Sequence, residues 1–394
     1  MNSHVRWVEI DHRALAHNVR ALKAHVGAAQ LWPVVKGRAY GHGPVEAART
    51  FLKAGASGLA VSALAEAVEL REAGIGAPLF VMNPAVPWQA DVYAALRITA
   101  SVADLDAARA LSEAVAAYAS GRSQAAGEPL PVHVKVDTGL GRFGLSPEEA
   151  VPFVETLQGM PGLRVEGVFT HLASADEEDT SFARVQLERF ENVLRRLTEA
   201  GLRPPLVHAA NSPATLALPQ GHYNMVRNGL AVYGLYPSPS TRRAAEAAGV
   251  ELRPALSLKA RAVSVRRVGP DTPIGYGSTY RTSRETTIVT LPIGYSDGVS
   301  RLLSGKLEVL VHGQRRPVVG RICMNHCMVD AGDLPVRRGD VVTLLGRDDT
   351  GAEIPAEEWA QRLGTIAYEV LCMVGSRNPR HHLYAAESEG GATA

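Results

Sequence analysis

Short apolar and β-branched runs alternate with longer stretches of helical period between about residues 30 and 235. Eight runs predict strands: LWPVV (31–35), GLAVS (58–62), PLFVM (78–82), RITAS (97–101), PVHVKVD (131–137), VEGVFTH (165–171), PLVHAAN (205–211) and MVRNGLAVYG (225–234). Intervening helices are clearest at 43–54, 102–119, 147–158 and 180–200. Because no Gly-rich dinucleotide fingerprint follows the first strand, this pattern favours a (β/α)8 barrel over an open doubly wound sheet.

After about residue 248 the pattern changes to alternating apolar and polar positions, at 257–268, 286–294, 306–313, 316–324 and 340–346. Such runs, separated by Pro and Gly, predict a mainly antiparallel β domain. A short helix is expected at 355–363, and WVEID (7–11) is expected to be a strand associated with the β domain. We therefore predict an α/β protein with an N-terminal strand region (1–11), a barrel (12–247), a C-terminal β domain (248–385) and a disordered tail (386–394).

Length and charge narrow the class of protein. The chain has 394 residues, of which 46% are hydrophobic and 21% charged, so it can bury a large core in two domains. Its 41 Lys and Arg residues balance 40 Asp and Glu residues, which predicts no nucleic-acid partner. The first twenty residues hold no apolar run long enough for a signal peptide or a membrane span. We expect a cytoplasmic protein with no membrane partner.

The cysteines suggest neither a disulfide framework nor a metal centre. Cys323, Cys327 and Cys372 are too few for the former and suit a reducing compartment. Cys323 and Cys327, with His326 between them, could suggest zinc, but a fourth ligand is missing and the flanking residues favour a strand. We therefore expect no metal.

Polar residues stand where the predicted barrel strands end. In (β/α)8 barrels, catalytic groups collect at the carboxyl ends of the strands. The residues at these ends are Lys36, Asp137, Arg142, His171, Asn211, Ser212, Arg227 and Asn228. They are predicted to converge on one rim of the barrel.

Lys36 directly follows an apolar run in PVVKGRAYGHG (33–43). One interpretation is a lysine whose stem lies along the barrel mouth while its ammonium group stays in water. The other is a Schiff-base lysine, whose partly desolvated amine is a nucleophile at neutral pH. The second interpretation gains support from the phenol of Tyr40, and from Gly41 and Gly43, which allow the backbone to approach a ligand closely.

The segment ANSPAT (210–215) offers backbone N–H groups and a hydroxyl to a phosphate. Ser212 is the predicted N-cap, with Pro213 at the first helical position, and an ordinary helix cap is the alternative interpretation. Gly229 and Leu230 would add the second half of the phosphate site that barrels commonly build after strands seven and eight.

Six motifs in order resemble those of bacterial alanine racemases, pyridoxal-phosphate enzymes of fold type III, over about residues 5–380. They are PVVKGRAYGHG (33–43), KVDTGLGRFG (135–144), IGYGSTY (274–280), GYSDG (294–298), GRICMNHCMVD (320–330) and AYEVLCMV (367–374). The resemblance implies an enzyme that interconverts L- and D-alanine by two-base proton transfer on pyridoxal 5'-phosphate and supplies D-alanine for peptidoglycan. It also implies a homodimer with shared active sites.

The resemblance further implies roles for single residues. Lys36 would hold the cofactor and act as the base on the D face, and Tyr276 of the partner subunit would be the base on the L face. Without the motif, Tyr276 would be an ordinary turn tyrosine. Arg227 would hydrogen-bond the pyridine nitrogen; because guanidinium keeps its protons, that nitrogen would stay unprotonated and side reactions would be suppressed. Arg142 and the Met324 backbone would bind the substrate carboxylate.

Other positions follow the same resemblance. The phosphate ligands would be Tyr40, Ser212, Gly229, Leu230 and Tyr368, with Asn211 a further cofactor-binding candidate. His171 would support Arg227, and Tyr295 would line the substrate entrance. Lys135 stands where some relatives carry a carbamylated lysine that orients Arg142; the alternative is a plain lysine paired with Asp137.

Two departures from the family pattern make the site more positive. Gly37 and Arg38 stand where the family usually has Ala-Asn or Ala-Asp, and Asn325 stands where it usually has aspartate. Two alternative functions remain at this point. A racemase of another small or broad-range amino acid, such as serine or lysine, would use the same fold, whereas a non-catalytic pyridoxal-phosphate-binding protein would lack the β domain and Tyr276.

Overall fold

The computed structural model describes residues 4–121 and 128–384, so the tail predicted at 386–394 lies outside the described residues. Two compact units make up the chain. The barrel unit comprises Ala16–Ala39 and Pro44–Arg253, and the β unit comprises the residues up to Leu15, the segment Tyr40–Gly43 and the residues from Pro254 onward. The barrel unit ends at Arg253 and the main part of the β unit begins at Pro254, while the segment Tyr40–Gly43 belongs to the β unit.

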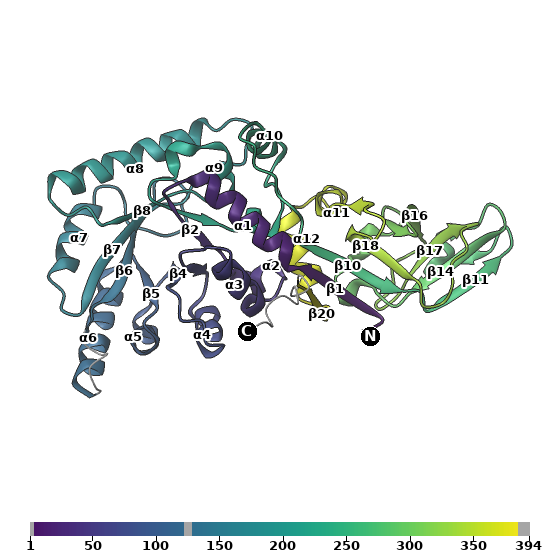
Figure 1. The fold of residues 1–394 in the computed structure, drawn as a ribbon, viewed down its shortest axis with the longest axis horizontal. Helices are drawn as coiled ribbons and strands as arrows, with labels where there is room; N and C mark the ends of the chain where they lie inside the picture. The colour runs from purple at the N-terminus through teal and green to yellow at the C-terminus, as the bar shows by residue number, and fades with distance from the viewer. Residues whose placement is uncertain (1–3, 122–127, 385–394) are drawn as a thin grey trace, which may run out of the picture. The chain divides into compact units, whose positions relative to one another are not determined.

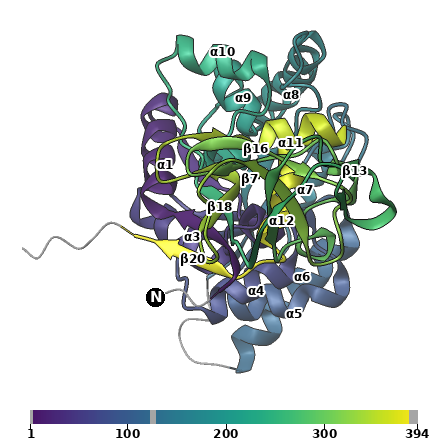
Figure 2. The same cartoon turned by 90° about the vertical axis from the view of Figure 1, so that its right-hand side faces the viewer.

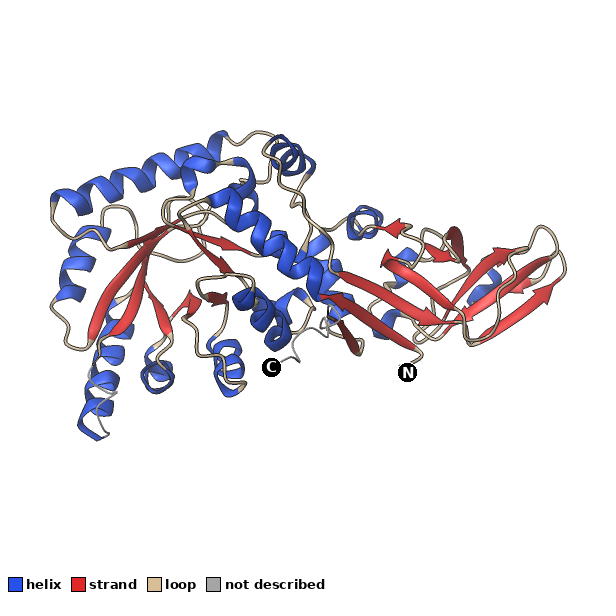
Figure 3. Cartoon of the chain, in the orientation of Figure 1, coloured by secondary structure: helices blue, strands red, loops and turns tan. Residues whose placement is uncertain are grey.

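The barrel unit is a barrel-like ring of parallel strands surrounded by helices (Figures 1 and 3). Its strands are β2 (Gln30–Pro33), β3 (Leu59–Val61), β4 (Leu79–Pro84), β5 (Thr99–Val102), β6 (Leu130–Lys135), β7 (Leu163–Phe169), β8 (Leu206–His208) and β9 (Met225–Asn228). Strands β3 to β8 pair in chain order, and β2 pairs with β9. The ring is completed by a bridge between Val34 and Ala60 and by a hydrogen bond from Arg227 N to Ala210 O of 2.9 Å.

Helices cover these strands. They are α1 (His12–Val26), α3 (Pro44–Lys53), α4 (Leu64–Glu72), α5 (Ala90–Leu96), α6 (Leu105–Gly121), α7 (Ala150–Gln158), α8 (Ser181–Glu199), α9 (Ser212–Ala217) and α10 (Pro239–Ala247). In α8, the buried residues Ala183, Leu187, Phe190 and Leu194 recur every three or four positions and form one apolar face. None of the described helices is long and apolar enough to cross a membrane.

The β unit is built on one large sheet of order β11-β14-β17-β16-β15-β18-β10-β1-β20 (Figures 1 and 2). The strands are β1 (Arg6–Asp11), β10 (Leu256–Arg261), β11 (Ser264–Val268), β14 (Thr286–Leu291), β15 (Glu308–Val311), β16 (Gln314–Val319), β17 (Cys327–Gly332), β18 (Val341–Arg347), β19 (Glu353–Ile354) and β20 (Arg380–Leu383). Pairs are antiparallel except β1 with β20. A hairpin of β12 (Pro273–Ile274) and β13 (Tyr280–Arg281), and helices α11 (Ala356–Leu363) and α12 (Ala367–Gly375), complete the unit.

The fold class is the predicted one, but individual elements differ. The strand expected at 225–234 ends at Asn228, because Gly229 leaves the strand conformation and Leu230–Tyr233 form a 3-10 turn. The run 257–268 is interrupted between Arg261 and Ser264, so it forms two strands. Strand β17 and helix α12 were not predicted.

Candidate active site

Lys36 is followed by a left-handed turn. Gly37, Arg38, Ala39 and Tyr40 have φ values of 61°, 56°, 55° and 52°. The turn is fixed by hydrogen bonds from Ala39 N to Val35 O (2.9 Å) and from Gly37 N to the Glu66 carboxylate (2.7 Å). Glycine adopts this conformation freely, whereas each of the other residues is strained by about 1–2 kcal/mol. The backbone that presents Lys36 is therefore held by the fold against its local preference.

Arg227 lies in the core of the barrel unit, with only 2% of its surface exposed. Its guanidinium donates to the carbonyls of Thr170 (2.9 Å) and Ala209 (3.2 Å), to Nδ1 of His171 (3.4 Å) and, through Nη1, to Nδ1 of His208. Burial lowers the pKa of Arg227 to about 9, so it stays cationic at neutral pH. No carboxylate of the described residues forms an ion pair with this cation.

Two buried histidines, His133 and His208, and the partly buried His171 lie next to Arg227 or are linked to it by hydrogen bonds. His171 Nδ1 accepts from Arg227 at 3.4 Å, while His208 is the nearer neighbour. His208 Nε2 lies 2.9 Å from Nδ1 of His133. Burial, reinforced by the charge of Arg227, lowers the pKa of each of these histidines, so all three are neutral at neutral pH. His133 and His208 were not among the predicted site residues, although His133 and Lys135 are two residues apart in β6 and share a face.

Lys135 is buried at the end of β6, with 1% of its surface exposed. Its Nζ donates to the Val136 carbonyl at 2.9 Å and lies 5.2 Å from the centre of the Phe169 ring. Burial, together with the positive charges of Arg227 and Arg142, lowers the pKa of Lys135 to about 7, and Asp137 only partly opposes this. Its amine is therefore substantially uncharged at neutral pH.

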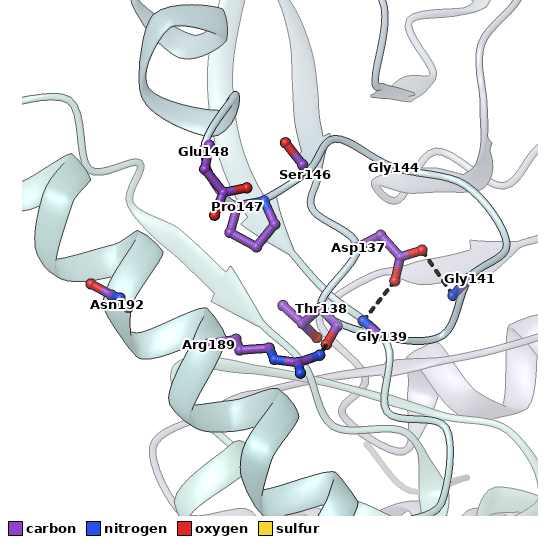
Figure 4. A pocket seen from close by; sticks show the side chains of 10 residues that line it. All are labelled: Asp137, Thr138, Gly139, Gly141, Gly144, Ser146, Pro147, Glu148, Arg189 and Asn192. Carbon is purple, nitrogen blue, oxygen red and sulfur yellow. Dashed lines mark hydrogen bonds between the residues drawn. The ribbon is translucent and has the colours of Figure 1, made fainter.

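The loop that carries Arg142 is held by hydrogen bonds between its two ends. Leu145 N donates to Lys135 O (2.9 Å), and Asp137 N donates to Leu145 O (2.8 Å). The Asp137 carboxylate accepts from Gly139 N at 2.9 Å and from Gly141 N at 2.8 Å (Figure 4). Burial opposes ionisation of Asp137, but its backbone donors outweigh burial and hold its pKa below the usual value.

A cavity of about 630 Å³ lies between this loop and α8. Figure 4 shows Arg189 of α8 reaching across to the Thr138 carbonyl, to which it donates at 2.9 Å. Gly144 borders the cavity at φ 129°, and a β-carbon there would lie 3.0 Å from Lys135 Cγ. The loop therefore needs glycine at this position to fit against Lys135.

The predicted phosphate-binding segments come together in the barrel unit. Asn211, and not Ser212, is the N-cap of α9, and its side chain accepts from Ala214 N at 3.2 Å. The prediction of Ser212 as cap was therefore wrong by one residue. This frees the Ser212 hydroxyl, which accepts from Ala231 N at 3.2 Å and so links α9 to the turn that begins at Gly229 and Leu230.

The second half of the Lys36 motif packs within the β unit. The rings of Tyr40 and Tyr368 have their centres 6.0 Å apart. Arg380 donates to the carbonyls of both Gly41 and Gly375, each at 2.8 Å. These contacts hold Tyr40 against α12, which carries Tyr368.

Four further candidates lie at the surface of the β unit. Tyr276 is 70% exposed, Met324 55% and Tyr295 36%. Ser296 Oγ donates to Met324 O at 2.9 Å, and Asn325 Nδ2 donates to Ser296 Oγ at 2.7 Å. The Asn325 amide thus supports the loop that presents Met324.

Comparison with known proteins covers both units. Residues 10–237 match the family model described as alanine racemase, N-terminal domain, and residues 255–382 match alanine racemase, C-terminal domain. The alanine racemase of Desulforamulus reducens is 44% identical over 96% of this chain and 98% of its own length. The crystal structure of alanine racemase from a D-cycloserine-producing Streptomyces lavendulae is 40% identical, with a TM-score of 0.87, over 98% of this chain and 99% of that chain. The Bacillus anthracis alanine racemase with bound L-Ala-P is 39% identical, with a TM-score of 0.85, over 97% and 96%.

Proposed function

The chain belongs to the alanine racemase family, and from that premise we propose which of its residues carry out the reaction. The activity is racemisation of alanine, an isomerisation that supplies D-alanine for peptidoglycan, and the family depends on pyridoxal phosphate. We assign the two proton transfers to Lys36 and Tyr276, and the binding of the cofactor ring to Arg227.

The described residues fit pyridoxal phosphate. Arg227 is a buried cation that no carboxylate of the described residues neutralises, which suits a site for an unprotonated ring nitrogen. Ser212 and the turn at Gly229 and Leu230 lie together at the end of β9 and would hold the phosphate, as would Tyr40 and Tyr368. Asn211 caps the N-terminus of α9 and would contribute to this site by holding the first turn of that helix in place. When bound, the cofactor withdraws electrons from the substrate Cα and acidifies its C–H bond.

The chain's own groups then move the proton. In the L-to-D direction, Oη of Tyr276 accepts the Cα proton on one face, and Nζ of Lys36 delivers a proton to the opposite face. The reverse direction exchanges these roles. Arg142 and the Met324 backbone hold the substrate carboxylate, and Tyr295 borders its entrance. Arg227 keeps its own protons, because its pKa stays above neutral, and so leaves the ring nitrogen unprotonated.

We propose that Tyr276 acts in a partner subunit. Its side chain is 70% exposed in the single chain, which would leave a proton-transferring phenol in bulk water. Exposed apolar side chains of the same unit include Leu302 (70%), Ile366 (60%) and Met324 (55%). We propose that these side chains belong to one apolar surface that another chain covers. A symmetric homodimer would cover them and bring Tyr276 to the partner's Lys36.

Lys135 is proposed to carry a carbamate. Its Nζ would attack the carbon of CO₂, forming an N–C bond and releasing one proton to solvent. A neutral amine is required, and the pKa of Lys135, lowered to about 7, provides one at neutral pH. The product places an anion near Arg142 and Arg227, whose positive charges disfavour a protonated lysine at this position. Incorporation of ¹³CO₂ at Lys135, observed by NMR, tests the modification.

The observation that carries the site assignment is the buried Arg227, with no carboxylate partner among the described residues, beside the turn that we propose binds phosphate. The test is to reduce the protein with borohydride in the presence of pyridoxal phosphate and to map the labelled peptide. Label on Lys36 supports the assignment, and label on another lysine contradicts it. Incubation with each L-amino acid, followed by measurement of the D enantiomer, defines the substrate range.

A further inference from the structure

A chain of hydrogen bonds connects Arg227, through two buried histidines, to the carboxylate of Glu166. Arg227 Nη1 donates to Nδ1 of His208, and His208 Nε2 lies 2.9 Å from Nδ1 of His133. His133 Nε2 in turn lies 3.3 Å from a carboxylate oxygen of Glu166. Both histidines are fully buried, while the Glu166 side chain is 20% exposed.

The direction of every hydrogen bond in this chain is fixed by its two ends. Guanidinium can only donate, so Nδ1 of His208 must accept and the proton of this neutral ring must be on Nε2. That proton points at Nδ1 of His133, which must accept, so the His133 proton is on Nε2 and points at Glu166. Carboxylate can only accept, so every donor in this chain of hydrogen bonds meets an acceptor. The hydrogen bond from His133 also lowers the pKa of Glu166, which keeps that end ionised.

The barrel core is shaped to hold the two imidazoles. Strand β7 has Gly167 beside the His133 ring, and a β-carbon there would lie 2.8 Å from ring atoms of His133. The ring of Phe169 stacks on His208 with centres 4.8 Å apart and an angle of 6° between the planes. Phe80 contacts His133, with ring centres 4.6 Å apart. Neither imidazole can turn over without displacing these neighbours.

We propose that Glu166 is a positioning residue for the reaction, acting through His133 and His208 to hold the guanidinium of Arg227 in one orientation. The inference rests on the proposed role of Arg227 toward the cofactor ring. Without an acceptor at position 166, the Nε2–H of His133 is buried with no partner, and this cost favours moving its proton to Nδ1. His208 would then carry its proton on Nδ1 as well and meet Arg227 donor to donor, so Arg227 would have to shift.

Three variants of the full-length enzyme test this inference. Glu166→Leu removes the acceptor, Glu166→Gln retains an oxygen that can accept, and Arg164→Met is the matched control. The control removes the ion pair between Arg164 and Glu166 (2.8 Å) but leaves the acceptor for His133 in place. Glu166→Ala, which adds no bulk, replaces the leucine variant if that variant does not fold.

The first measurement is the tautomer of each histidine, read from two-bond ¹⁵N–¹H spectra of protein labelled with ¹⁵N-histidine, before and after pyridoxal phosphate is added. In the wild type, Glu166→Gln and Arg164→Met, both His133 and His208 are expected to be protonated on Nε2. In Glu166→Leu, protonation on Nδ1 is expected to appear at both rings. Unchanged tautomers in Glu166→Leu would overturn the inference.

The second measurement is steady-state racemisation of alanine. In Glu166→Leu, kcat is expected to fall roughly fivefold or more, the factor that corresponds to one net hydrogen bond, with KM changed less than about twofold. Glu166→Gln and Arg164→Met should keep at least about half of the wild-type kcat. A leucine variant with changed tautomers but full kcat would also overturn the inference. Full activity in Arg227→Gln would instead contradict the assignment of Arg227, whatever the tautomers show.

Discussion

Gly41 and Gly375 meet backbone to backbone: a β-carbon on Gly375 would lie 2.5 Å from Gly41 Cα, and one on Gly41 would lie 2.5 Å from Leu371 O. Their two carbonyls share the side chain of Arg380. Glycine is needed at both positions because any side chain would push the segment that carries Tyr40 away from α12.

Gly375→Ala is therefore expected to lower the free energy of unfolding by about 1–3 kcal/mol, the usual effect of overpacking. Urea unfolding followed by circular dichroism measures it. Gly269→Ala in the same unit is the control, since a β-carbon there would meet nothing within 4 Å. Equal stability of the two variants would show that the backbone contact can relax.

Arg38, which the resemblance predicts to depart from the family pattern, has a φ of 56°. Asparagine tolerates the left-handed region better than arginine does, so Arg38→Asn should raise the free energy of unfolding by roughly 0.5–1 kcal/mol. Arg38→Lys keeps both the charge and the strain and should leave stability unchanged. If both variants unfold at the same urea concentration, the strain at this residue does not limit stability.

The buried amine of Lys135 predicts a pH-dependent stability. The unfolded chain keeps this lysine protonated up to about pH 10.5, whereas the folded chain does so only up to about pH 7. Between these values the unfolded state binds the extra proton, so the contribution of Lys135 to stability rises with pH, by about 1.4 kcal/mol per unit.

Lys135→Met removes this contribution. In CO₂-free buffer, the stability of the wild type relative to Lys135→Met should therefore increase from pH 7 to pH 9, as urea unfolding at each pH would show. Parallel curves for the two proteins would mean that the folded chain keeps Lys135 protonated.

Asn325→Asp should weaken substrate binding. An added negative charge near the carboxylate of alanine is worth on the order of 1 kcal/mol, so KM is expected to rise about three- to tenfold. Aspartate also lacks the amide proton that Asn325 donates to Ser296, so the Ser296 hydroxyl would turn away from Met324 O. Ser296→Ala separates the two effects, because it breaks the hydrogen bonds without adding charge. A similar KM in both variants would assign the effect to loop position.

Shared active sites predict recovery of activity in mixed dimers. Lys36→Ala and Tyr276→Phe should each be nearly inactive alone, since loss of a proton-transfer group lowers rate by about 10²- to 10⁴-fold. In a heterodimer both lesions fall in one site and the other site is intact. Refolding an equimolar mixture should therefore restore about a quarter of wild-type activity if pairing is random. No recovery, with dimer exchange shown independently, would mean that each chain uses its own tyrosine.

The parts of the fold that the sequence predicted are those where burial alone decides the structure. Parallel strands buried on both faces form continuous apolar runs, so β2 to β8 were located to within a few residues. The run 225–234 is just as apolar, but its second half is buried as a 3-10 turn after Gly229. Apolarity does not distinguish a buried strand from a buried turn.

The sequence likewise predicted some residues of the candidate site and not others. Lys36, Ser212 and Arg227 stand next to recognisable strand ends, so their position at one end of the strands followed from the barrel pattern. His133 and His208 lie inside strands, where a histidine has no distinctive spacing. Their importance comes from pairing across strands β6 and β8 with Arg227, a relationship between distant parts of the chain that one sequence does not contain.

The absence of a side chain at Gly167 has a consequence for the evolution of this barrel. Because the ring of His133 occupies the space where a side chain at position 167 would be, the two positions share one fixed volume. Relatives that keep histidine at position 133 should keep glycine at position 167, and those that gain a side chain at 167 should carry a small residue at 133. The two positions should therefore change together among homologues.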